Sequence, residues 1–252
     1  MNVTDIITSL ELPVSALVDQ RVPKRLLLEN GAITASDKRL INDGIQEINW
    51  IAAIKPTTVG VPEYRDDGRE YLEIAILSLT LRSQAKTGRI AELVHRAIPY
   101  PVWLLILQEE QVTISLAHKR WAQNEINKVV LEGEVVELGI ESHLKPEAKR
   151  GFLQALSLMN QRRTNLMVLY QGWIDTLLAL QAAHLTGVFV QVNTTEHAAL
   201  RREALAQYNH LSRQIATLRS QAIREHQINR RVELNVEIKR LEKKLDEALT
   251  NI

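Results

Sequence analysis

The stretch IPYPVWLLILQEEQVTISLAHKRW, residues 98–121, decides the fold that we predict for this chain. Residues 102–107 are continuously apolar, which is typical of a strand buried on both faces. Residues 109–111 supply a turn, and the residues after the turn alternate between apolar and polar, as in a strand with one buried and one outward face. Pro99 and Pro101 exclude a helix at the entrance. The stretch therefore predicts a buried β-hairpin.

The residues before this hairpin predict strands and helices in mixed order. Apolar residues have strand periodicity in 45–54 and 71–81 and helical periodicity in 86–97, where His95 is interpreted as a packing residue. The earlier predictions are a helix opened by Pro13, a helix near 22–30 ended by Gly31 as a left-handed cap, a helix from Ala35 to about Asn42 with a Thr34/Asp37 capping box, and a long turn or loop over 56–69.

The residues after the hairpin change from strand to helical patterns. One or two edge strands are predicted in 125–140, so the first part of the chain is a mixed sheet of about five strands with helices on a face. Helices are predicted at 148–159 and 165–185, and Gly187 ends the second. Because that helix is apolar nearly all round, we expect it to be buried against protein. A short strand at 188–192 is the one further strand considered.

Residues 196–249 predict one long helix, about 80 Å if unbroken. Two apolar seams mark it, and they do not share a register because residues 224–231 interrupt them. This break predicts a stutter. Three arrangements of the helix stay open: antiparallel packing inside the chain, dimerisation and pairing with another protein. The seam residues that we expect to pack against a partner helix are Leu211, Ile215, Leu218, Leu234, Ile238, Leu241 and Leu245.

The predicted fold class is therefore α+β, an N-terminal mixed β-sheet with helices followed by an all-helical region that ends in a long coiled-coil-like helix. The predicted domains are a head (1–145), a helical connector (146–195) and a helical tail (196–252).

Composition excludes several classes of function. The chain has 252 residues, 31 Lys and Arg against 30 Asp and Glu, and no cysteine, so thiolate catalysis, disulfides and cysteine–metal sites are excluded. The start resembles no signal peptide and no apolar stretch approaches the roughly 18 residues of a membrane span, so we expect a cytoplasmic protein that contacts no membrane.

The candidate catalytic residues are few. Glu70 and Glu73 are paired carboxylates near a predicted strand, a pattern with which nucleases hold a metal ion. The usual companion lysine, two residues past an acid on a neighbouring strand, occurs only in the helical contexts of 147–149 and 237–239. Motifs for a P-loop, a nucleophilic serine elbow and a dinucleotide are absent from the sequence, so we expect no cofactor and no metal site elsewhere. The sequence favours a binding protein over an enzyme.

Basic residues provide the candidate contacts to nucleic acid or to an acidic partner. In the polar break, three arginines form the surface with the strongest functional indication, although a solvated helix surface explains them equally well. The candidate contact residues are Lys24, Arg25, Lys119, Arg120, Arg224, Arg230 and Arg231.

Four segments together resemble an uncharacterised bacterial family catalogued only as a domain of unknown function. They are VPKRLLLENGAITASDKRLINDGIQEINWIAAIKPTTVGVP, the IPYPV entrance, NLMVLYQGWIDTLLALQAAHLTGVF and HQINRRVELNVEIKRLEKKL. Genes of that family are commonly found beside SNF2-type helicases, adenine methyltransferases and type III-like restriction helicases. The resemblance implies a role in anti-phage defence or DNA modification and carries over no catalytic residue.

The function predicted first is a non-enzymatic accessory or adaptor subunit of such a system. Its expected partner is a helicase or methyltransferase subunit, or a second copy through the C-terminal helix. The alternatives are a nucleic-acid-binding module that contacts DNA directly and, less favoured, a metal-dependent nuclease.

Overall fold

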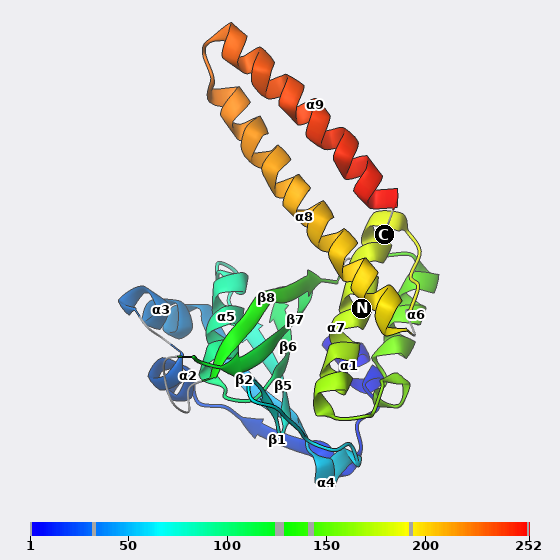
Figure 1. Ribbon diagram of the computed structural model, residues 1–252. Helices are drawn as coiled ribbons and strands as arrows, with labels where there is room; N and C mark the ends of the chain where they lie inside the picture. The colour runs from blue at the N-terminus through cyan, green and yellow to red at the C-terminus, as the bar shows by residue number, and fades with distance from the viewer. Residues whose placement is uncertain (1, 32–33, 124–128, 141–143, 192–193, 251) are drawn as a thin grey trace. The chain divides into compact units, whose positions relative to one another are not determined.

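The first part of the chain folds around one six-stranded sheet (Figure 1). The computed structural model describes residues 2–31, 34–123, 129–140, 144–191, 194–250 and 252. In spatial order the strands are β1 (Leu17–Arg21), β2 (Ile45–Ile54), β5 (Ile74–Leu81), β6 (Val102–Gln108), β7 (Gln111–Trp121) and β8 (Val129–Gly139). β5 and β6 run parallel, and every other neighbouring pair is antiparallel. The predicted mixed sheet is thereby confirmed.

The hairpin at residues 98–121 is confirmed inside this sheet, between β5 and β8. β6 and β7 pair from Trp103 opposite Leu116 to Gln108 opposite Gln111, and Glu109 takes a positive φ of 55° in the turn between them. All apolar residues of β6 from Val102 to Ile106 are buried, since the strand is covered on both faces.

Helices on one side of the sheet join β2, β5 and β6 in a single core. These are α2 (Lys24–Asn30), α3 (Ala35–Arg39) with the π-helical turn η2 (Leu40–Gly44), and α5 (Thr87–Ala97). The capping box at the start of α3 is confirmed, because Thr34 Oγ1 accepts from the Asp37 N–H at 3.1 Å and Asp37 Oδ2 accepts from the Thr34 N–H at 3.2 Å.

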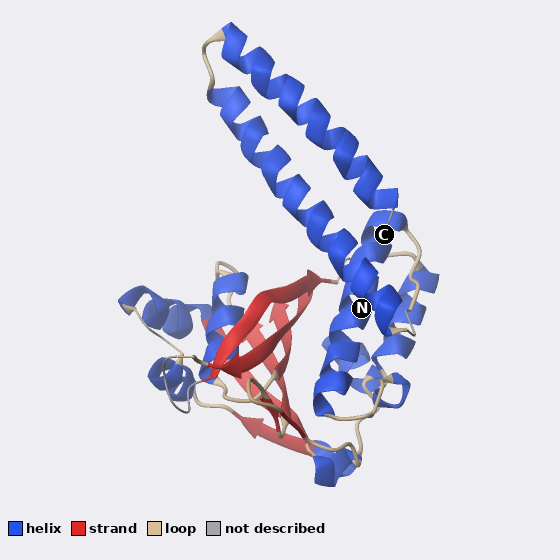
Figure 2. Ribbon diagram, in the orientation of Figure 1, coloured by secondary structure: helices blue, strands red, loops and turns tan. Residues whose placement is uncertain are grey.

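A second group of helices lies on the opposite side of the sheet (Figure 2). It comprises α1 (Val3–Ser9), α6 (Pro146–Leu156) and the first part, residues 166–177, of α7 (Leu166–Thr186). The Tyr170 hydroxyl of α7 donates to the Val102 carbonyl at 2.7 Å and accepts from the Ala117 N–H at 2.9 Å. The Trp173 indole donates to the Leu156 carbonyl at 2.9 Å. The expectation that this apolar helix is buried is therefore confirmed, and helices cover both faces of the sheet.

Several local predictions were wrong. Pro13 precedes the short 3₁₀ turn η1 (Val14–Ala16) and the exposed edge strand β1, not a helix. The predicted loop 56–69 holds the short helix α4 (Pro56–Val59) and β3 (Tyr64–Arg65), which pairs with β4 (Glu70–Tyr71) in a separate two-stranded sheet. The predicted strand from residue 71 is interrupted, and β5 begins at Ile74. The 3₁₀ turn η3 (Leu158–Asn160) follows α6, and the described residues 188–191 form no strand.

The predicted single helix over 196–249 is in fact two antiparallel helices, α8 (Thr195–Arg224) and α9 (Ile228–Thr250). The chain leaves α8 at Glu225, whose ψ of 125° is extended, and re-enters a helix within three residues. Glu225 to Gln227 carry no apolar side chain, and reversal there lets each seam bury itself against the other. We call this α8–α9 pair the arm.

The chain divides into two compact units, Met1–Leu177 and Leu178–Ile252, and the boundary falls within α7. α6 and the first half of α7 belong to the unit that contains the sheet. The arm belongs to the other unit.

Candidate functional site

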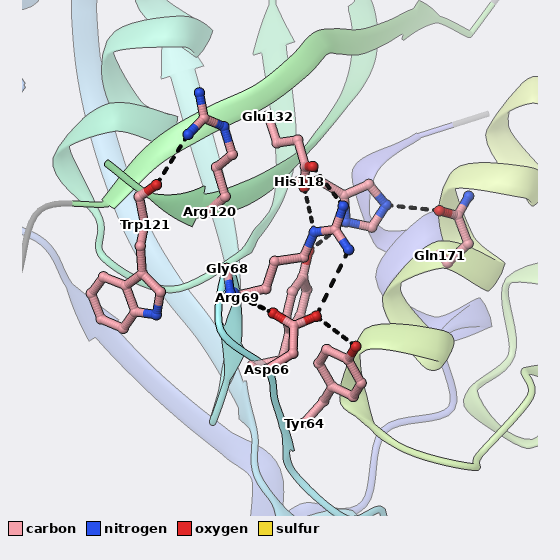
Figure 3. Close-up of polar contacts among 10 residues, drawn as sticks. Tyr64, Asp66, Gly68, Arg69, His118, Arg120, Trp121, Glu132 and Gln171 are labelled. Atoms are coloured by element: carbon pink, nitrogen blue, oxygen red, sulfur yellow. Dashed lines mark hydrogen bonds and ion pairs between the residues drawn. The ribbon is translucent and has the colours of Figure 1, made fainter. Parts of the chain in front are cut away.

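The β3–β4 hairpin is fixed by a set of charged hydrogen bonds (Figure 3). Asp66 Oδ1 accepts from the N–H groups of Gly68 at 2.8 Å and Arg69 at 2.6 Å, and the Tyr64 hydroxyl donates to Asp66 Oδ2 at 2.7 Å. The Arg69 guanidinium forms a bidentate pair with Glu132 of β8, with both N–O distances at 2.6 Å. Fork-to-fork pairs of this kind hold a fixed geometry, so the hairpin is held against β8.

His118 of β7 lies at the centre of a directed hydrogen-bond chain. Its Nε2 contacts Gln171 Oε1 at 2.8 Å, and since an amide oxygen only accepts, Nε2 carries the proton. Nδ1 then accepts from the buried Tyr71 hydroxyl. The Gln171 amide donates onward to Asp175 Oδ1 at 2.9 Å. Burial lowers the pKa of His118, which agrees with a neutral ring. With both nitrogens engaged, His118 connects β4, β7 and α7 and is not a free base.

A second buried group lies under α5. His95 Nε2 and Ser115 Oγ are 2.9 Å apart, and both residues are fully buried. The Ser115 hydroxyl also lies 3.5 Å from Glu137 Oε1. A serine and a histidine at this distance resemble part of a hydrolase triad, but no substrate can reach a hydroxyl that is sealed beneath a helix. The prediction that His95 is a packing residue agrees with this placement.

The candidate carboxylates Glu70 and Glu73 are each neutralised by a separate cation. Glu70 pairs with Arg65 at 3.1 Å, and the buried Glu73 pairs with Lys55 at 3.0 Å. Among the described residues, no group of three or more His, Asp or Glu side chains is placed to hold a metal ion. The structure therefore does not bring these two carboxylates together with further acidic ligands.

The four basic candidate residues of the sheet-containing unit differ in their exposure to solvent. Arg25 is exposed and pairs with Glu29 at 2.6 Å, whereas the Lys24 ammonium donates to the Asn42 carbonyl at 3.0 Å. Arg120 is half-buried and donates to the Trp121 carbonyl. Lys119 is only 3% exposed and its ammonium donates to the Ile98 carbonyl. Lys119 therefore does not present a charge to a phosphate, and we withdraw it as a contact residue.

The seam of the arm is buried within the arm itself. All seven predicted packing residues lie in or against one cluster between α8 and α9: Leu211, Ile215, Leu218, Leu234, Ile238, Leu241 and Leu245. Of the three arrangements left open by the sequence, the structure shows antiparallel packing inside the chain. These residues are consequently not the surface that a partner helix contacts.

The arginines of the break lie at the tip of the arm. Arg224, Arg230 and Arg231 are all exposed, and Arg230 pairs with Glu233 at 2.7 Å. The other two have no acidic partner among the described residues.

Sequence reasoning missed an apolar stripe beside these arginines. Ile228, Val232 and Val236 follow one another at four-residue spacing along α9 and are 68%, 54% and 63% exposed. We call these three residues the tip stripe. Val232 and Val236 each lie two positions from the seam residue Leu234, which places them on the side of α9 away from α8. The spacing was visible in the sequence, but only one seam, that of Leu234, Ile238, Leu241 and Leu245, was assigned to this part of the chain.

The comparisons with known proteins find one match. A sequence profile described as Domain of unknown function (DUF4391) matches residues 10–245. No curated protein and no solved structure matches the chain. In the part of the chain that the structure describes, every helix is too short or too polar to cross a membrane.

Proposed function

We propose that this chain, which belongs to the DUF4391 family of domains of unknown function, is a non-catalytic accessory subunit that docks a larger protein through the tip of its arm. The observation that carries the proposal is the exposed tip stripe, Ile228, Val232 and Val236.

The tip stripe is not needed to hold the arm together. The seam already supplies the apolar surface that α8 and α9 bury against each other. Three large aliphatic side chains in a row on the outer side of a helix leave apolar area in water, and burial of each would contribute about 1.5–3 kcal/mol. Apolar surface at helical spacing is what a partner helix or groove contacts.

The charges around the tip stripe favour an acidic partner. Arg231 precedes Val232 directly, Arg224 ends α8, and neither arginine has an acidic partner among the described residues. An amphipathic helix with an aliphatic face and flanking carboxylates would satisfy both features. We therefore assign an acidic amphipathic helix of another protein as the occupant of the tip.

The identity of the partner is proposed from the family resemblance. A family whose genes commonly lie beside helicases and adenine methyltransferases supports a helicase or methyltransferase subunit as the docked protein. The chain would then act in an anti-phage defence or DNA-modification system in the cytoplasm.

The first test is recovery of the partner with the tagged, full-length chain from its native cell. We expect stoichiometric recovery of one helicase or methyltransferase subunit with the wild type. The double variant Val232→Asp/Val236→Asp should reduce that recovery at least about tenfold, because the loss of two buried side chains exceeds the roughly 1.4 kcal/mol of a tenfold change.

The matched control adds the same two negative charges elsewhere on the arm. Gln207→Glu/Gln214→Glu changes exposed positions of α8 and should leave recovery unchanged. Recovery of the wild-type chain alone, or equal recovery with the tip variant, would contradict the proposal. Size-exclusion chromatography with light scattering separates a second copy of the chain from a different partner.

A further inference from the structure

The sheet-containing unit has a concave site that the proposed docking function does not use. It is a hollow of about 490 Å³ between α3 with η2 on one side and the loop from β5 to α5 on the other. Its lining includes Ser36, Arg39, Asp43, Arg82 and Ser83. Its polar lining side chains belong to two arginines, two serines, one aspartate and one glutamine.

The walls of this hollow are fixed by hydrogen bonds. The Gln108 amide nitrogen donates to the carbonyls of Arg82, Ser83 and Ala85 at 3.0, 3.1 and 3.0 Å. Arg82 Nη1 also donates to the Asp43 carbonyl at 2.7 Å, which joins the loop to η2. The site is therefore preorganised, and a ligand would not have to order the loop.

A second hollow lies next to the first, because one lysine of its lining and one arginine of the first hollow donate to the same carbonyl. Its volume is about 360 Å³ and its lining includes Arg21 and Lys24. Lys24 Nζ and Arg82 Nη1 both donate to the Asn42 carbonyl, at 3.0 and 3.4 Å. Partial burial and the nearby charges of Arg82 and Arg21 lower the pKa of Lys24, and the charge of Asp43 opposes them only in part. Like charges are thus gathered around one point.

These cations are weakly compensated. Among the described residues, Arg21, Arg39 and Arg82 form no ion pair with an acidic side chain. Asp43 and Glu47 are the acidic residues that line the two hollows, against the four cations Arg21, Lys24, Arg39 and Arg82. Such an excess of positive charge across two adjoining concavities suits a chain of anions better than a single anion.

We propose that this corner, defined by Arg21, Lys24, Arg39 and Arg82, binds the phosphodiester backbone of double-stranded nucleic acid. Arginine and lysine would contact phosphate oxygens, and the Ser36 and Ser83 hydroxyls would donate to them. None of the described residues that line the hollows is aromatic, so the corner offers no platform on which unpaired bases stack. Binding should consequently favour a duplex and show no sequence preference.

The test is fluorescence anisotropy of the full-length chain with a labelled duplex of about 20 base pairs, between about 50 and about 200 mM KCl. We expect the wild type to bind, with an affinity that falls as salt rises. The variant Arg21→Gln/Arg39→Gln removes two exposed cations that have no described ion pair. It should weaken binding about tenfold at low salt and lower the slope of log K against log salt by about two, since each neutralised phosphate contributes about 0.9.

The control Lys243→Gln/Lys244→Gln removes two exposed charges from α9 and should bind like the wild type. Unchanged thermal melting by circular dichroism verifies that each variant is folded. The tip variant Val232→Asp/Val236→Asp should also retain duplex binding, so the result is independent of the proposed docking function.

Three outcomes would overturn the proposal. The first is no anisotropy change with wild type at low salt, and the second is an equal loss in the α9 control. The third is equal or tighter binding of the single strand. A competition experiment adds millimolar inorganic phosphate at constant ionic strength. Displacement of the duplex there would assign a site for a single phosphate ion, and retention of the duplex supports the backbone site.

Discussion

Two buried bases, His95 of α5 and Lys119 of β7, influence each other between α5 and the sheet. Burial lowers the pKa of His95 to about 3, with the charge of Lys119 adding to the effect, and burial lowers the pKa of Lys119 to about 7. His95 Nδ1 has no hydrogen-bond partner in the structure. A proton added to this ring would therefore be a buried charge without a counterion, so the native state requires neutral His95.

This requirement predicts acid destabilisation. The folded pKa of His95 lies below its unfolded value of about 6.5, so the unfolded state binds the proton first and stability is lost as pH falls from about 6.5 towards 3. At pH 5 the loss from His95 is about 2 kcal/mol. Urea unfolding at about pH 7.5 and pH 5 measures it.

The variant His95→Gln removes this titration and should show an acid loss smaller by about 2 kcal/mol than that of the wild type, although it is less stable at pH 7.5. The control His197→Gln changes a solvent-exposed histidine in the first turn of α8. An equal acid loss in His95→Gln and the wild type would show that His95 does not stay neutral.

Lys119 was predicted to contact nucleic acid or a partner, and its burial shows why that prediction failed. The alternation after the turn correctly places Val112, Ile114 and Leu116 in the core, and it predicts that Lys119 faces outward. The opposite face of β7 is in fact covered by α5, which buries Ser115 and Lys119. Alternation identifies the two faces of a strand but not whether a distant helix covers the second.

Gly31 ends α2 as predicted, but its lack of a side chain is required by packing against α5. Its φ of −110° is an ordinary value, so the predicted left-handed cap is wrong. A Cβ atom at this position would lie 2.6 Å from the Leu93 carbonyl oxygen and 2.9 Å from the Ala97 Cβ of α5. The absent side chain therefore lets α2 end directly against α5.

The substitution Gly31→Ala should separate these helices and lower the free energy of unfolding by about 1–3 kcal/mol, the usual cost of overpacking. Urea unfolding at pH 7.5 provides the measurement. Gly68→Ala is the control, because its Cβ would meet no atom closer than 3.6 Å. Equal stability of the Gly31 variant and the wild type would indicate that α2 moves freely relative to α5.

The elements with a clear apolar pattern were predictable, and those set by tertiary contact were not. β2, β7 and α5 repeat an apolar period, while β6 and α7 are nearly continuous apolar runs. β1 has an exposed pattern and exists because it pairs with the edge of β2. The reversal between α8 and α9 falls in the polar break of residues 224–231, but it contains neither Gly nor Pro, so the break predicted a stutter and not a turn. The basic corner likewise joins residues 21–24, 39 and 82, which no motif connects.

At the scale of the whole molecule, the two units have separate cores. The arm is held by its own seam, in which Ile238 is 7% exposed, while the sheet is covered by its own helices. Units with separate cores can open independently. A carboxylate forced into the seam should therefore unfold the arm and leave the sheet-containing unit folded.

Limited trypsin digestion of full-length Ile238→Asp, read by mass spectrometry, tests this independence. An unpaired buried charge costs several kcal/mol, so the arginines and lysines of α8 and α9 should be cleaved at least about tenfold faster than in the wild type. A resistant fragment that contains residues 2–177 should persist. Val236→Asp places the same charge at a 63% exposed position of α9 and should digest like the wild type. Faster cleavage throughout residues 2–177 in Ile238→Asp would show instead that the two units unfold together, and an unchanged arm would show that the seam does not hold it.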